Sequence, residues 1–335
     1  TTYDMIDFDI IENLGLEKAI SVTSESNQIS ESQLVVINQV KDFGIDEIYF
    51  STDENHNSYP AVFLKRVDKF DDLALHQVAN VQKKIWNFKK VIFLYVYSET
   101  EIRIYNCAEK PLLIKSNDFD YKKELKTLEI ESYKYKDKTK LKQLQNLFST
   151  IAIDTGIIWT LEEAYDIRKK ISLQRRVDKY LVESLTNTAK QLQEDGLEIN
   201  LIHKIIMRSL FLLYLEDRGA TDEKFYSEIK KGAKSYFDIL DDADKTYSLF
   251  QKLEEYFNGN VFTIDRNESI SREHLHIVKK CFINGNDNSL QQNLFEDLRL
   301  FDFSIIQIEL LSEIYENFLA EINPTLKQDT GTYYT

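Results

Sequence analysis

Apolar residues in the first third of the chain recur with two periods, one typical of helices and one typical of strands. Leu34, Ile37 and Val40 follow helical spacing as far as Gly44, and a glycine there can end a helix. Short runs rich in β-branched and aromatic residues predict strands at residues 45–50, 60–67, 91–97 and 101–105. Another helix is predicted at residues 70–88, capped near Asp71. The order helix, hairpin, helix, hairpin predicts a small α/β domain.

Beyond about residue 140 the apolar spacing is helical almost throughout. Helices are predicted at residues 141–153, 161–174, 177–194, 199–218 and 304–321, with shorter ones between. Residues 108–140 are rich in lysine and tyrosine and poor in aliphatic residues, so we place a domain boundary there. The expected fold class is α+β. A small α/β domain at residues 1–115 precedes an all-α connector domain at 116–322, and a further domain begins at 323–335.

Length and composition limit the number of domains and the cellular compartment expected for this chain. With 335 residues and 43% hydrophobic residues, two domains can each bury a core. Two cysteines make no disulfide framework, and we see neither a signal segment nor an apolar run long enough to cross a membrane. These features predict a cytoplasmic protein with no membrane partner.

Charge bears on the choice of partner. A net charge of −14 argues against this chain as the main clamp on DNA, because positive charge supplies most non-specific affinity for phosphates. Three stretches are nevertheless rich in lysine or arginine, at residues 83–90, 122–142 and 168–176. Each is open to two interpretations, a solvated helix face or a contact with nucleic acid.

Three later stretches carry a resemblance to a known family. They lie at residues 202–219, at 253–262, and at 310–319 followed by a polar linker and the end sequence Gly-Thr-Tyr-Tyr-Thr. Together they resemble the connector and the entry to the methyltransferase domain of γ-type N6-adenine DNA methyltransferases, especially those fused to restriction enzymes of type IIG and type IIS-like systems. The resemblance implies that Tyr334 and Thr335 contact S-adenosylmethionine in that domain. The later methyltransferase motifs are absent from this sequence, so we expect no methyl transfer from this chain alone.

The element order of the first domain is also that of the PD-(D/E)XK nuclease core, the fold of many restriction endonucleases. In that fold an aspartate on one strand and an acidic-X-lysine triplet on the next hold a divalent metal that activates water. Asp46 stands where the first aspartate is expected, and Lys65 where the lysine is expected. Phe63 occupies the position that should be acidic, which leaves one carboxylate where Mg²⁺ needs at least two.

Two interpretations follow from this departure. If the nuclease works, Asp46 binds Mg²⁺, Lys65 stabilises the attacking water or the phosphate charge, and Glu31 or Glu47 supplies the missing carboxylate. If it does not, the domain positions double-stranded DNA for a methyltransferase domain of the same polypeptide, or serves as an inactive docking module. Gln82 is a further candidate, because related nuclease folds bring a glutamine on the corresponding helix close to DNA.

A zinc site is not expected. His274 and His276 lie close in sequence to Glu268, but no cysteine pair or third histidine stands at metal-binding spacing. A rival of a different class is a helical interaction protein with no enzymatic role.

Overall fold

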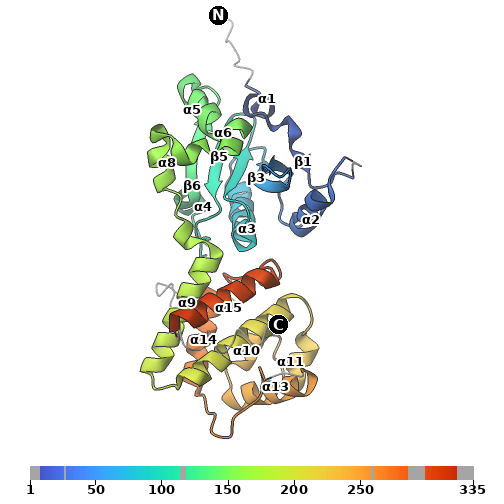
Figure 1. Cartoon of the computed structure of the whole chain (residues 1–335), viewed down its shortest axis with the longest axis vertical. Helices are drawn as coiled ribbons and strands as arrows, with labels where there is room; N and C mark the ends of the chain where they lie inside the picture. Colours follow the sequence, from blue (N-terminus) through green and yellow to red (C-terminus); the bar gives the residue numbers. More distant parts are fainter. Residues whose placement is uncertain (1–7, 26–27, 114–117, 258–259, 286–298, 323–335) are drawn as a thin grey trace, which may run out of the picture. The chain divides into compact units, whose positions relative to one another are not determined.

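A computed structural model describes residues 8–25, 28–113, 118–257, 260–285 and 299–322. The chain divides into two compact units. One comprises Thr1–Leu112 and Ser116–Val177, and the other Leu113–Lys115 and Asp178–Thr335. The described strands all belong to the first unit, and the second is built from helices (Figure 1). This architecture confirms the predicted mixture of an α/β part and an all-α part.

A six-stranded mixed sheet forms the centre of the first unit. Its strands lie side by side in chain order: β1 (Ile20–Ser21), β2 (Glu47–Thr52), β3 (Ser58–Arg66), β4 (Phe93–Tyr97), β5 (Glu101–Asn106) and β6 (Glu129–Lys134). β3 and β4 run parallel, and the other neighbouring strands are antiparallel. A parallel pair needs a crossover, which the helix α3 (Asp72–Phe88) provides.

Local sequence signals explain the first elements. The Asp71 carboxylate accepts a hydrogen bond from the Ala74 N–H at 2.9 Å, so the predicted cap of α3 is confirmed. Ser30 and Gln33 form a capping box at the start of α2 (Glu31–Val40). The four predicted strands correspond to β2, β3, β4 and β5, with ends that differ by at most two residues.

Further helices of the first unit cover the sheet. They are α1 (Ile10–Leu14), α4 (Tyr121–Glu124), α5 (Lys138–Phe148), α6 (Thr150–Thr155), α7 (Ile157–Thr160) and α8 (Tyr165–Lys169). On one face of the sheet, Val62 and Leu64 of β3 share a core with Leu144 of α5 and with apolar residues of α1, α7 and α8. Because side chains alternate along a strand, Phe63 points to the other face, where its ring centroid lies 6.0 Å from that of Phe88 of α3.

The first unit extends further along the chain than the predicted boundary at residue 115. Residues 116–177 belong to it because β6 pairs with β5 and because α5 packs on the sheet core. The lysine-rich composition of this stretch does not mark a linker. Its buried positions alternate with exposed lysines, since Tyr133 and Tyr135 are buried while Lys134 and Lys136 are exposed.

The second unit contains seven described helices. They are α9 (Val177–Glu194), α10 (Ile199–Asp217), α11 (Glu223–Ile229), α12 (Tyr236–Ile239), α13 (Ala243–Tyr256), α14 (Arg272–Asn284) and α15 (Ile308–Ile322). Helix α10 supplies much of the core, with residues such as Ile205, Ile206 and Leu213 fully buried. It ends at Asp217, one residue before the predicted end at residue 218. In the described part of the chain, no helix is both long and apolar enough to cross a membrane.

Candidate functional site

The structure brings Asp46 and Lys65 together, as the strand order predicts. Glu47 pairs with Leu64 across β2 and β3, so Asp46 and Lys65 lie opposite each other at the next position and on the same face as Phe63. Both polar side chains are engaged with the backbone. The Asp46 carboxylate accepts a hydrogen bond from the Arg66 N–H at 2.7 Å, and the Lys65 ammonium donates to the Gly44 carbonyl oxygen at 2.9 Å. These bonds join the start of β2 to the end of β3, at the end of the strand pair away from the turn.

Phe63 lies in the apolar layer beneath α3. Its side chain is fully buried, and its ring contacts Phe88, which in turn packs edge-on against Phe43 at 5.7 Å between centroids. A carboxylate at this position would be removed from water and surrounded by aromatic rings. The position that should supply the second metal ligand is therefore part of the core.

Glu47 lies on the opposite face of the sheet from Phe63 and Lys65, because it neighbours Asp46 along the strand. Its Oε2 atom is buried and makes no hydrogen bond to any described residue. Burial raises the pKa of this carboxyl, and the negative charge of Asp46 raises it further. Glu47 cannot join Asp46 and Lys65 around one ion without reversing its face, so it does not replace the missing ligand.

Glu31 is placed far from the pair. The Gln33 side chain contacts the Ser58 hydroxyl at 3.4 Å, which fixes the start of α2 beside the start of β3. Lys65 stands seven residues further along β3, or about 23 Å at the usual rise of a strand. The exposed carboxylate of Glu31 therefore lies beyond the reach of a metal held by Asp46.

Gln82 is in the interior rather than on a surface that could meet DNA. It is fully buried, and its amide nitrogen donates to the carbonyl oxygens of Asn106 at 3.1 Å and Glu109 at 2.8 Å. These bonds join α3 to the last residue of β5 and to the chain that follows it. This position corrects the expected approach of Gln82 to DNA, because an amide at helical spacing on a long amphipathic helix can face inward when backbone acceptors meet it there.

The two residues expected to contact S-adenosylmethionine, Tyr334 and Thr335, lie outside the described residues. Within the described ranges, no three His, Cys, Asp or Glu side chains come together in a way that could hold a metal ion. His274 takes part in the capping box of α14, and His276 lies 3.6 Å from Asp241. Each histidine therefore has a local role.

One polar cluster could not be anticipated from the sequence. The Asp154 carboxylate on α6 accepts hydrogen bonds from the Tyr49 hydroxyl at 2.7 Å and from the Ser51 hydroxyl, both on β2. Burial raises the pKa of Tyr49, and its bond to Asp154 adds to the shift. These two bonds fasten α6 to the sheet, with one hydroxyl group on each oxygen of the Asp154 carboxylate.

Buried acids of the second unit also serve the structure. Asp217 at the end of α10 pairs with Arg299 and accepts the Phe303 N–H at 2.8 Å, and Glu216 accepts the Tyr236 N–H at 2.7 Å. Burial raises the pKa of both carboxyls. Asp217 binds the segment at residues 299–303, and Glu216 binds the first residue of α12. The resemblance noted at residues 202–219 therefore falls on residues that hold this helical unit together.

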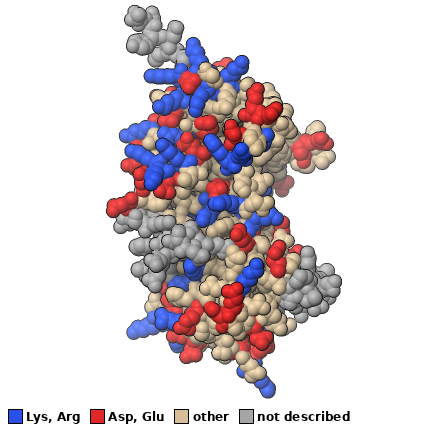
Figure 2. Space-filling view, turned by 90° about the vertical axis from the view of Figure 1, so that its left-hand side faces the viewer, with Lys and Arg blue, Asp and Glu red and all other residues tan. Residues whose placement is uncertain are grey.

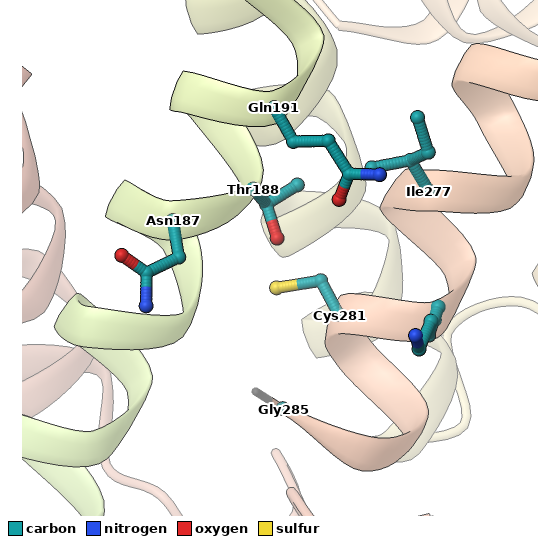
Figure 3. Close-up of a pocket in the computed structure, with 7 residues that line it drawn as sticks. Asn187, Thr188, Gln191, Ile277, Cys281 and Gly285 are labelled. Atoms are coloured by element: carbon teal, nitrogen blue, oxygen red, sulfur yellow. The ribbon is translucent and has the colours of Figure 1, made fainter. Parts of the chain in front are cut away.

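A small polar hollow lies between α9 and α14 in the second unit. It has a volume of about 240 Å³, and Asn187, Thr188 and Gln191 line it from α9. The Thr188 hydroxyl and the Cys281 thiol point toward each other across it (Figure 3). Burial raises the pKa of the Cys281 thiol to about 12, which favours its neutral form near neutral pH. The hollow therefore presents a neutral thiol rather than a nucleophile.

Both cysteines are expected to resist modification in the folded protein. Cys107 is also buried, and burial raises its pKa as well. In a reaction with an aromatic disulfide reagent at pH 8, we expect each thiol to react at least about 100-fold more slowly in the native chain than in urea. A native thiol that reacts as fast as free cysteine would contradict this expectation, and Cys107→Ser and Cys281→Ser variants identify which one it is.

Comparison of the chain with protein families, curated proteins and solved structures gave no match.

Proposed function

We propose that the first unit is a nuclease-like domain without metal-dependent cleavage, and that the chain positions double-stranded DNA for an N6-adenine methyltransferase domain of the same polypeptide. S-adenosylmethionine is the cofactor of that methyltransferase domain, not of the described units. The chain is thus a DNA-handling part of a restriction-modification enzyme.

The proposed loss of cleavage rests on where the structure places the three residues expected to form the metal site. Phe63 is sealed in the core, Asp46 is bonded to the Arg66 amide, and Lys65 is bonded to the Gly44 carbonyl. A hard divalent cation needs several oxygen ligands at one point, and these positions offer a single carboxylate, which also accepts the Arg66 amide through Oδ2. Glu31 and Glu47 do not converge on it.

Two features support the nuclease-like origin and the methyltransferase context. The elements α2, β2 and β3, α3, and β4 and β5 follow the helix, hairpin, helix, hairpin order of the PD-(D/E)XK core. The three helical stretches that resemble connectors of fused adenine methyltransferases lie in the second unit, on α10, around the end of α13, and on α15.

The loss of cleavage is tested by metal binding and DNA nicking on the same samples. We expect no saturable heat when Mg²⁺ or Mn²⁺ is titrated into the chain, and no nicking of supercoiled plasmid at millimolar metal. Asp46→Asn is the matched control, because an amide oxygen can still accept the Arg66 hydrogen bond while the charge is removed. Wild type and variant should behave alike. Binding and nicking that both disappear in Asp46→Asn would overturn the proposal.

A further inference from the structure

The three basic stretches of the sequence differ in how far their charges are already used. In the first, Lys84 donates to the Asp42 carbonyl oxygen at 2.6 Å, Lys90 lies 5.3 Å from the Phe88 ring centroid, and Lys83 and Lys89 also have partners. These side chains hold α3 to its surroundings. Little free positive charge remains there for a ligand.

The third stretch is used in the same way. Arg168 donates to the Ile158 carbonyl oxygen at 3.0 Å, Lys170 to that of Ile130 at 2.7 Å, and Arg175 pairs with Glu109 at 3.1 Å. The Arg168 bond joins α8 to α7, and the bonds of Lys170 and Arg175 join the segment after α8 to β6 and to the chain after β5. The basic side chains of both stretches therefore make contacts within the first unit, which neither of the two sequence interpretations anticipated.

The second stretch, residues 122–142, differs in its later part. Lys122 pairs with Asp72 at 3.5 Å, and three acids lie between residues 124 and 131. Residues 132–147, from the end of β6 through α5, then contain five lysines and a single acid, in a chain whose net charge is −14. That acid, Asp137, is the N-cap of α5 and accepts the Lys140 N–H at 3.1 Å. The five lysines are all exposed: Lys134, Lys136, Lys138, Lys140 and Lys142. Figure 2 shows blue side chains gathered in the upper part of the view, on the side where α5 lies in Figure 1.

Four of these lysines have no partner among the residues that the structure describes: Lys134, Lys136, Lys138 and Lys142. Lys140 alone is paired, with Glu131 at 3.4 Å between two partly exposed groups. An exposed pair of this kind contributes little and is easily exchanged for another anion. The charge of this surface is thus available to an external partner.

We propose that the β6–α5 lysine surface, made of Lys134, Lys136, Lys138, Lys140 and Lys142, binds the phosphate backbone of duplex DNA. This inference rests on the proposed function and names the part of the chain that carries it out. The surface is held by rigid elements, because Leu141, Leu144 and Phe148 anchor α5 in the sheet core. Lys138 and Lys142 stand one helical turn apart, or about 6 Å, so neighbouring ammonium groups can contact successive phosphates of one strand.

The surroundings of the lysines favour a duplex over other polyanions. Proteins that hold single strands add exposed aromatic rings on which bases stack, and the two tyrosines of this segment, Tyr133 and Tyr135, are buried. Helices that lie on membranes insert apolar residues, whereas the apolar side of α5 is covered by the sheet. Contacts through phosphates alone are independent of sequence, which suits a positioning surface.

The test is a salt-dependent binding measurement with matched variants. The surface variant replaces four lysines by glutamine: Lys134, Lys136, Lys138 and Lys142. The control variant replaces four exposed lysines of the second unit in the same way: Lys190, Lys231, Lys234 and Lys245. Both variants therefore lose the same positive charge. Affinity for a fluorescent duplex is measured by anisotropy between 50 and about 200 mM salt. Single-stranded DNA and anionic lipid vesicles serve as competitors, and circular dichroism verifies that each variant is folded.

We expect the surface variant to bind the duplex at least about tenfold more weakly and to reduce the slope of log K against log salt by up to about 4, near 0.9 for each phosphate that is no longer neutralised. The control should bind like the wild type. Equal losses in both variants would overturn the lysine surface while leaving a DNA-positioning function in place. A chain that binds no duplex at low salt would overturn both, and preferential competition by vesicles or single strands would overturn the choice of duplex DNA.

Discussion

Replacing Arg208 with methionine is expected to lower the free energy of unfolding of the second unit by about 3–5 kcal/mol. The Arg208 guanidinium is fully buried, and the side chain of its partner Glu268 is 2% exposed. The same guanidinium donates to the carbonyl oxygens of Val261 at 3.0 Å and Thr263 at 2.9 Å. Methionine restores part of the volume but leaves the buried Glu268 carboxylate without its counter-charge and with the Asp265 N–H as a remaining donor. The Val261 carbonyl oxygen also loses its donor, and the desolvation of these groups is then poorly compensated.

Two features of the chain make this measurement selective. Its two tryptophans, Trp86 and Trp159, belong to the first unit, so their fluorescence follows that unit. The long helices α9 and α10 lie in the second unit, and far-UV circular dichroism in urea follows their loss. The dichroism transition of Arg208→Met should therefore move to lower urea by more than the fluorescence transition.

A neighbouring pair provides the control. Lys204 and Asp265 are 2.5 Å apart and tie the same loop to α10, but the Asp265 side chain is 68% exposed. Lys204→Met should lower the free energy of unfolding by only about 0–1 kcal/mol, because an exposed pair gains little over its hydration. Arg208→Met combined with Glu268→Leu should recover a large part of the loss, since the double change removes both buried charges. A loss in Arg208→Met no greater than in Lys204→Met would contradict this account.

Signals carried by neighbouring residues were sufficient to predict much of the first unit. The cap at Asp71, the β-branched runs and the turn between β4 and β5 are local, because each depends on residues within a few positions of one another. Even the placement of Asp46 opposite Lys65 follows from two strands joined by a short connection. The structure adds the register that fixes which side chains share a face.

Features that depend on distant parts of the chain could not be predicted. The bond between Tyr49 and Asp154 joins residues 105 positions apart, and the pair formed by Arg208 and Glu268 joins residues 60 apart. Composition alone could not show that β6 pairs with β5, because an edge strand with exposed lysines has the composition of a polar linker. Burial of Gln82 likewise depends on carbonyl groups supplied by the last residue of β5 and by Glu109 after it.

Phe63→Glu is expected to lower the free energy of unfolding of the first unit by at least about 4 kcal/mol. The change restores the acidic residue that the nuclease pattern requires, yet it removes a fully buried ring and places a carboxylate against Phe88. Urea unfolding followed by tryptophan fluorescence measures the loss, because Trp86 is buried on α3, the helix that also carries Phe88. Tyr59→Glu is the control on the same strand. Tyr59 is 46% exposed, and its replacement should change the free energy by about 0.5 kcal/mol or less.

Adding Mg²⁺ to the Phe63→Glu variant distinguishes a lost metal site from a latent one. A site with a dissociation constant of about 0.1 mM would stabilise the fold by about 2.7 kcal/mol at about 10 mM metal, because binding to the native state alone shifts the unfolding equilibrium. We expect no such gain, since the Asp46 carboxylate already accepts the Arg66 amide and the Lys65 ammonium is held by Gly44. A gain seen with Phe63→Glu and abolished by adding Asp46→Asn would mean that the hairpin can release Asp46 to a cation. The loss of cleavage would then depend on one side chain, and the proposal that these strands have lost their metal site would fail.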